Sequence, residues 1–123
     1  MITGIVTVDR EAVINLTGRD PNGQEQKIEV VIDTGFNGSL TLPPALITAL
    51  GLPWRRRGRA LLADGNDSVF DIYEATVLWD GALRRVSVDE VDVMPLVGIS
   101  PLYGYELTVQ IVEGGSVLLK PLP

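Results

Sequence analysis

The stretch Val30-Val31-Ile32-Asp33-Thr34-Gly35 decides the fold predicted for this chain. Consecutive β-branched apolar residues are typical of a buried strand, and an Asp that follows them costs free energy if it is buried without partners. Thr34 supplies a hydroxyl group, and Gly35 lets the backbone approach closely and present its N–H. We therefore expect a buried strand that ends in a turn of hydrogen-bond donors, with the Asp33 carboxylate directed into a cleft.

Three interpretations of Asp33 compete. It could form an Asx-turn, in which its side chain accepts a hydrogen bond from the N–H two residues on. It could handle phosphate, but aspartyl-phosphate enzymes carry a second Asp at the position that Gly35 holds here, and actin-like sugar kinases need a much larger two-lobed body than 123 residues. It could also be the catalytic carboxylate of a peptidase.

Composition limits the chemistry that is available. The chain has 123 residues, enough for one domain, which we place at residues 1–123. It contains no histidine and no cysteine, which excludes Ser-His-Asp and Cys-His nucleophile systems, disulfides and the usual zinc sites. If the protein is an enzyme, carboxylates or hydroxyl groups must carry the chemistry, and we expect no metal and no other cofactor.

Charge and hydropathy indicate the partners. The net charge of −6 disfavours nucleic acid as a partner, although Arg55, Arg56, Arg57 and Arg59 form a basic run that we interpret as a solvated strand face. The N-terminal segment lacks the features of a signal peptide, and no apolar run is long enough to span a bilayer. We expect a cytoplasmic protein that binds neither nucleic acid nor membrane.

The pattern along the chain predicts an all-β fold with one or two short helices. Gly and Pro together are frequent, and short apolar stretches alternate with turn signals. The predicted helices are Pro44–Gly51, bounded by Pro and Gly, and one helical turn or a short helix at 101–107. Strands are expected at 2–8, 12–17, 25–33, 40–42, 54–63, 67–79, 82–91, 107–112 and 116–120.

This order of motifs resembles that of the retroviral-type (retropepsin-like) aspartic peptidases, particularly their single-domain bacterial relatives. The resemblance covers about residues 25–120. It rests on Asp33-Thr34-Gly35 after an apolar strand, then Leu40-Thr41-Leu42-Pro43 and a short helix, then a hairpin at about 58–76 with Gly65 at its tip. An apolar-apolar-Gly element, Leu96-Val97-Gly98, and a second short helix follow in the same order.

The resemblance implies a closed or partly open β-barrel and an endopeptidase that hydrolyses extended peptide segments. It implies that Asp33 is catalytic and that Thr34 and Gly35 support it, while Leu96, Val97 and Gly98 close a loop around the catalytic turn. The hairpin would act as a flap over the cleft. The residues implied to bind substrate are Phe36, Asn37 and Gly38 beside the catalytic turn and Asp64, Gly65 and Asn66 at the flap tip.

A single Asp-Thr-Gly predicts a homodimer. Peptide hydrolysis needs one ionised and one protonated carboxyl group, and two Asp side chains about 3 Å apart share one proton because both cannot ionise. A two-fold axis would bring Asp33 of each subunit together. The terminal strands, Ile2–Val8 and Ser116–Lys120, either interleave between subunits or pair within the chain; the sequence favours neither.

Two departures from the family pattern leave an alternative function open. The residue after the catalytic triplet is usually Ala or Ser and here is Phe36, which we expect to narrow the cleft or to reshape a subsite. The acidic residues that viral members carry at positions 37 and 38 and the Arg that follows Gly98 in them are missing together. The alternative is a weakly active or silent module for dimerisation or peptide binding, and a third possibility is an unrelated β-sandwich or barrel.

Overall fold

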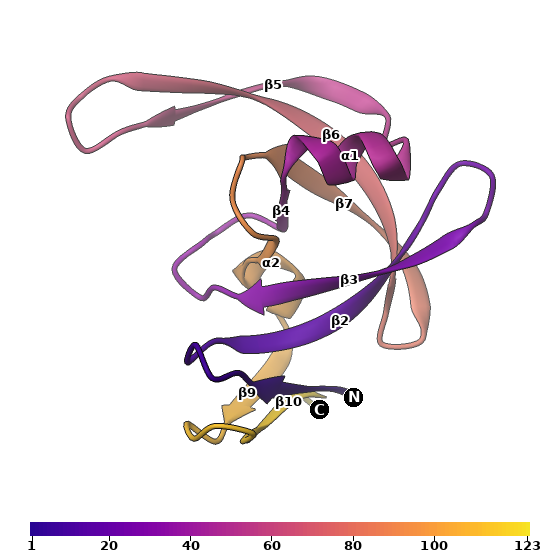
Figure 1. Cartoon of the computed structure of the whole chain (residues 1–123), viewed down its shortest axis with the longest axis vertical. Coiled ribbons are helices and arrows are strands. Elements are labelled where there is room, and N and C mark those ends of the chain that lie inside the picture. The colour runs from indigo at the N-terminus through magenta and orange to yellow at the C-terminus, as the bar shows by residue number, and fades with distance from the viewer.

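The computed structural model describes residues 1–123 as ten strands and two short helices (Figure 1). The strands are β1 (Ile2–Val6), β2 (Ala12–Arg19), β3 (Glu25–Ile32), β4 (Leu40–Leu42), β5 (Trp54–Leu61), β6 (Asp67–Trp79), β7 (Ala82–Glu90), β8 (Leu96–Val97), β9 (Tyr105–Val109) and β10 (Ser116–Pro121). The helices are α1 (Pro44–Leu50) and α2 (Ile99–Leu102). The all-β prediction is confirmed.

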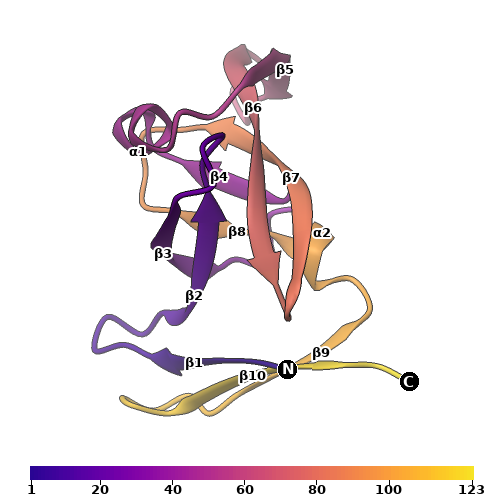
Figure 2. The ribbon, with the colours of Figure 1, turned by 90° about the vertical axis from the view of Figure 1, so that its right-hand side faces the viewer.

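All strands belong to one mixed sheet that partly closes on itself. Its order is β5-β6-β7-β4-β8-β3-β2-β1-β10-β9, and β6 also pairs with β2 across the fold. This additional pairing turns the sheet into a partly open barrel, as the sequence predicts. Figure 2 shows β1, β9 and β10 as a layer at one end of the molecule, below the barrel formed by the other strands.

The core is almost entirely aliphatic. Strands alternate between buried and exposed residues, which sends every second side chain inward. Val30, Leu42, Val88 and Leu119 are 0% exposed and come from four different strands. The interior therefore ties the terminal strand β10 to the strands around the predicted catalytic turn.

The two helices are short and differ in how well the sequence predicts them. α1 begins at Pro44 and ends at Gly51, whose φ of 60° is left-handed, as the Pro and Gly punctuation predicts. The helical turn expected within 101–107 is displaced: α2 ends at Leu102, and β9 begins at Tyr105. Gly104 lies between the two elements, and its left-handed φ of 91° is a conformation in which a helix cannot continue. Neither helix has the length and apolarity needed to cross a membrane.

The terminal strands pair within the chain. β1 is hydrogen-bonded to β2 on one side and to β10 on the other, and β10 also pairs with β9. The Met1 ammonium group forms an ion pair with Asp80, which also accepts a hydrogen bond of 2.9 Å from the Tyr105 hydroxyl. Of the two arrangements that the sequence leaves open for these strands, the chain adopts the internal one.

Removing a buried side chain from β10 should destabilise the whole barrel. We expect Leu119→Ala to lower the free energy of unfolding by about 2–5 kcal/mol, because Leu119 is fully buried and its loss leaves a cavity. Leu122→Ala, at a side chain that is 54% exposed, is the matched control and should change little. Denaturant unfolding followed by circular dichroism measures both; equal effects would show that β10 does not pack into the core.

Candidate active site

The turn after β3 is held by the segment Leu96–Gly98. β8 pairs in parallel with β3 and antiparallel with β4, so it lies between the strand that enters the turn and the strand that leaves it. The Asp33 N–H donates to the Val97 carbonyl at 2.9 Å, and the Gly98 N–H donates to the Ser39 carbonyl at 2.9 Å. We call this arrangement the backbone clamp. It fixes both ends of the turn without using a side chain of the turn itself.

The Asp33 side chain is half-buried at the start of this turn. Its Oδ1 accepts a hydrogen bond of 3.0 Å from the Gly35 N–H, and its carbonyl accepts one of 3.2 Å from the Phe36 N–H. The Asx-turn considered from the sequence is therefore present. It occupies one carboxylate oxygen, and Oδ2 has no hydrogen-bond partner within the chain. Thr34 and Gly35, next in the turn, are exposed.

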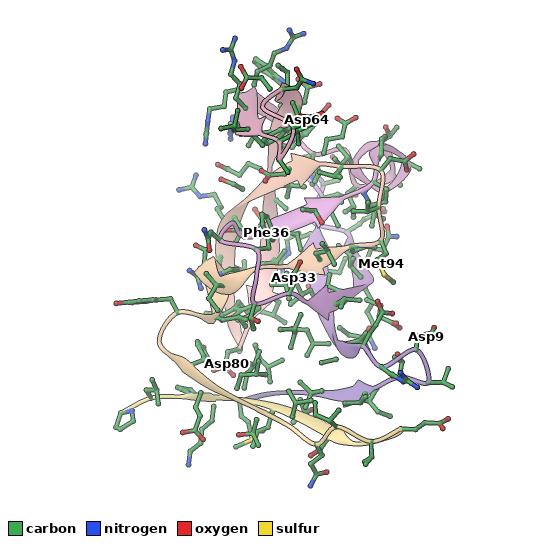
Figure 3. All side chains as sticks on the ribbon, turned by 90° about the vertical axis from the view of Figure 1, so that its left-hand side faces the viewer. Asp9, Asp33, Phe36, Asp64, Asp80 and Met94 are labelled. Carbon is green, nitrogen blue, oxygen red and sulfur yellow. The ribbon has the colours of Figure 1, made fainter.

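Phe36 packs onto its own loop. A Cβ added at Gly38 would lie 2.5 Å from Cζ of Phe36, and one added at Gly98 would lie 2.6 Å from its Cδ2. The ring therefore covers the space that these two glycines leave free. Figure 3 shows Phe36 close to Asp33 on the same face of the molecule. Both glycines are required because the ring and the backbone of the turn come so close.

Thr41 is a structural part of the clamp that sequence reasoning missed. It is the one buried polar residue, 5% exposed, and its Oγ1 accepts a hydrogen bond of 3.2 Å from the Leu96 N–H. A β-strand three residues long with a Thr between two Leu residues was the available signal, because a Thr that is buried in a strand needs a partner. Thr41 thus gives the Leu96 N–H of the clamp a hydrogen-bond partner from a side chain.

Exposed apolar residues surround the same segment and were also missed. Val93 and Met94, just before β8, are 44% and 50% exposed, and the neighbouring Pro95 carbonyl accepts a hydrogen bond of 2.9 Å from Val31 N–H. Figure 3 shows Met94 on the face that carries Asp33 and Phe36. Exposed apolar side chains that lie together are typical of interaction surfaces.

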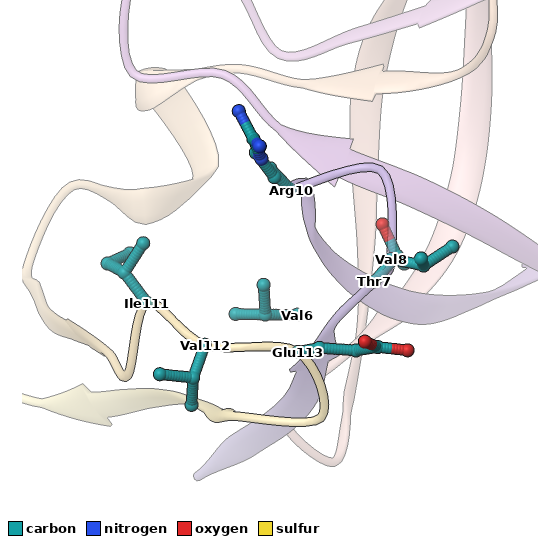
Figure 4. Close-up of a pocket in the computed structure, with 7 residues that line it drawn as sticks. All are labelled: Val6, Thr7, Val8, Arg10, Ile111, Val112 and Glu113. Carbon is teal, nitrogen blue, oxygen red and sulfur yellow. The ribbon is translucent and has the colours of Figure 1, made fainter.

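A hollow lies on the other side of the turn. It has a volume of about 300 Å³ and is lined by Thr34 and Ile32 from the turn and by Leu107, Val109 and Ile111 from β9 and the residues after it. A second hollow of about 370 Å³, between the ends of the β1–β2 and β9–β10 hairpins, shares Val6, Arg10 and Ile111 with the first (Figure 4). Arg10 has a left-handed φ of 64°.

The β5–β6 hairpin projects from the barrel with the predicted tip residues at its end. Asp64 accepts hydrogen bonds from the Asn66 N–H and Nδ2, at 3.0 and 3.1 Å, and Gly65 has a φ of 86°. These bonds from Asn66 hold the pKa of Asp64 below its usual value. Figure 3 shows Asp64 well separated from Asp33 and Phe36, so this single chain does not bring the tip onto the predicted catalytic turn.

Cross-strand ion pairs line the hairpin. Arg55 pairs with Glu74 at 3.0 Å, while Arg57 pairs with Asp71 and Arg59 with Asp67, both at 3.7 Å. The hydrogen bond from Arg55 lowers the pKa of Glu74. The basic run therefore faces acidic residues of the neighbouring strand. No group of three or more Asp or Glu side chains lies close enough together to hold a metal ion.

Comparison with known proteins supports a fold assignment. No protein-family model matches the sequence, and no curated protein is significantly similar to it. A retropepsin-like aspartic protease from Rickettsia conorii superposes with a TM-score of 0.61 at 18% identity, covering 99% of this chain and 91% of that one. EIAV protease, in a complex with the inhibitor HBY-793, superposes with a TM-score of 0.52 at 17% identity, covering 77% of this chain and 88% of that one. The chain therefore has the retropepsin-like fold that its motifs predict.

The contacts of Phe36 predict that Gly38 and Gly98 respond differently to substitution. Gly38→Ala should destabilise the protein because its Cβ would lie 2.5 Å from the Phe36 ring, which supplies its three nearest atoms, and adding Phe36→Ala should relieve that clash. Gly98→Ala should not be relieved in this way, because its Cβ would also lie 2.2 Å from the Gly38 carbonyl oxygen. Double-mutant cycles of unfolding free energy should give a coupling of about 0.5–3 kcal/mol for the Gly38 pair. Equal relief at both glycines would contradict this packing.

Proposed function

We propose that the chain is one subunit of a homodimeric aspartic endopeptidase, with Asp33 as its catalytic carboxylate. The observation that carries the proposal is the Asp33 turn, held by the backbone clamp in a retropepsin-like fold, with Oδ2 free of partners. The two solved structures of this fold described above are both named as proteases, one of them bound to an inhibitor.

In the proposed mechanism, the two Asp33 side chains of a dimer hold one proton between them. The ionised carboxylate takes a proton from a water molecule as that water attacks the peptide carbonyl carbon, and the protonated carboxyl group donates its proton to the carbonyl oxygen. The titration belongs to the pair and to neither residue alone. Each chain contains one Asp-Thr-Gly, so the second carboxylate comes from the partner.

The neighbouring residues receive their proposed roles from their positions. Thr34 is exposed next to Asp33, where its hydroxyl can bond to the facing subunit and fix the distance between the carboxyl groups. Phe36, Asn37 and Gly38 form the wall beside Asp33 and contact the substrate there. The β5–β6 hairpin is the flap, and substrate binding would draw its tip residues Asp64, Gly65 and Asn66 over the cleft and exclude water.

An extended peptide suits this site because an extended chain can add its backbone hydrogen bonds to exposed strand-like segments. The exposed Val93 and Met94 favour apolar side chains at the positions nearest the cleaved bond. A dimerisation or peptide-binding module without turnover would share the fold. The free Asp33 oxygen favours the enzyme, because such a module needs no unpartnered carboxylate at this place.

Replacing the proposed catalytic carboxylate should abolish turnover but keep the fold. We expect Asp33→Asn to lower peptide cleavage by at least about two to four orders of magnitude, because it removes the acid–base group and keeps nearly the same shape. Glu29→Gln is the matched control, since it makes the same change of charge at an exposed residue of β3 and should keep full activity. Cleavage of a mixed peptide library, from acidic to neutral pH and read by mass spectrometry, measures both.

The outcomes separate the functions. Cleavage by Glu29→Gln and not by Asp33→Asn is the expected result. Equal cleavage by wild type and Asp33→Asn would remove Asp33 from the mechanism. Peptide binding without cleavage by any variant would favour the binding module.

A further inference from the structure

We propose that Phe36 determines which peptides the site accepts: its ring occupies the place of one substrate side chain, so that cleaved peptides carry Gly or Ala at the position facing it. This inference rests on the proposed function and adds a substrate class to it. From the sequence, Phe36 is expected to narrow the cleft or to reshape a subsite, but the excluded side chains stay undefined. The contacts of the ring define them.

The ring fills a space that two glycines leave. Cβ atoms added at Gly38 and Gly98 would lie 2.5 and 2.6 Å from ring atoms of Phe36. Gly38 does not have the left-handed φ that favours glycine at other turns of this chain, and the three atoms nearest to its added Cβ all belong to the ring. Position 38 therefore makes room for the ring. With a small residue at position 36, a depression for one side chain would open beside Asp33.

Backbone hydrogen bonds on both sides of Phe36 hold the ring in this place. The Phe36 N–H donates to the Asp33 carbonyl at 3.2 Å, and the Phe36 carbonyl accepts a hydrogen bond of 2.8 Å from the Ile99 N–H at the start of α2. The Gly38 carbonyl accepts one of 3.2 Å from the Ser100 N–H. A ring turned into solvent would lose its packing contacts and leave the space empty, which costs free energy.

The surface is closed at Phe36 and carries exposed apolar groups elsewhere around Asp33. None of the four hollows of the structure is lined by Phe36, Gly38 or Gly98. Figure 3 shows Phe36 on one side of Asp33 and Met94, which is 50% exposed, on the other. Successive side chains of an extended peptide point in opposite directions. A peptide over Asp33 can therefore direct a large apolar side chain toward Met94 and a small neighbouring one toward Phe36.

The proposed dimer imposes this restriction twice. A two-fold axis through the pair of Asp33 carboxyl groups places one Phe36 ring on each side of the cleaved bond, because each subunit contributes the same surface. We therefore expect Gly or Ala at one position on each side of that bond.

Removing the ring should admit larger side chains. We expect wild type to prefer Gly or Ala over Leu by at least about tenfold at one position on each side of the cleaved bond, since each methylene group that a pocket excludes is worth about that much. Phe36→Ala should lose this preference. Leu46→Ala, which truncates a half-buried side chain of α1 outside the site, is the matched control for lost packing and should keep it. Mass spectrometry of a cleaved peptide library measures all three.

Partial refilling of the space shows whether the ring acts by occupying it. Adding Gly38→Ala to Phe36→Ala returns a methyl group to the vacated space and should restore part of the preference. Phe36→Leu leaves a smaller side chain there and should keep part of it. Phe36→Leu also carries the test if circular dichroism shows that Phe36→Ala does not fold.

The outcomes separate this inference from the proposed function. Equal cleavage of Leu and Ala peptides by wild type, or an unchanged preference in both Phe36→Ala and Phe36→Leu, would overturn the role of Phe36 and leave the peptidase in place. If wild type cleaves no peptide, the proposed function is contradicted, and the inference falls with it.

Discussion

The hydrogen bonds between the Asp33 turn and the segment Leu96–Gly98 are the constraint on which the rest of the structure depends. They join β8 to β3 and β4, which lie far from it in the sequence, and they hold the turn while leaving one Asp33 oxygen free. A half-buried carboxylate at the end of an apolar strand is costly, and the Gly35 N–H of the turn that the clamp holds donates a hydrogen bond to it. The need to hold this turn explains why Thr41 is buried in β4 and why positions 38 and 98 are glycines.

The same constraint accounts for Phe36. A ring directly after Asp33-Thr34-Gly35 predicts a narrowed cleft or a reshaped subsite when it is judged from sequence, and in the structure the ring also fills the space above Gly38 and Gly98. Packing within the loop gives the ring a structural role that the sequence could not reveal. The contact between Phe36 and Gly98 exists only because β8 lies beside the turn. A small residue at position 36 would leave this space empty.

Local signals predicted much of the fold. The apolar run before Asp33, the Pro and Gly at the ends of α1, and the Asp64-Gly65-Asn66 turn each act over a few residues, and each is where the sequence places it. The second short helix is present as α2 (Ile99–Leu102) but ends earlier than the expected range 101–107, because Gly104 has a left-handed φ and β9 pairs with β10 from Tyr105 on. The internal pairing of β1 with β10, the buried Thr41 and the exposed Val93 and Met94 depend on contacts between distant segments, which periodicity does not report.

The central claim is that two copies of Asp33, one from each chain, form one catalytic centre. Mixing wild type with Asp33→Asn, and allowing the subunits to exchange, tests it most directly. If each active centre needs both carboxylates, an equal mixture of the two proteins should retain about one quarter of the activity of the same total amount of wild type, because only wild-type pairs are active. Retention of about one half, falling in proportion to the variant added, would show that each chain acts alone and would contradict the account.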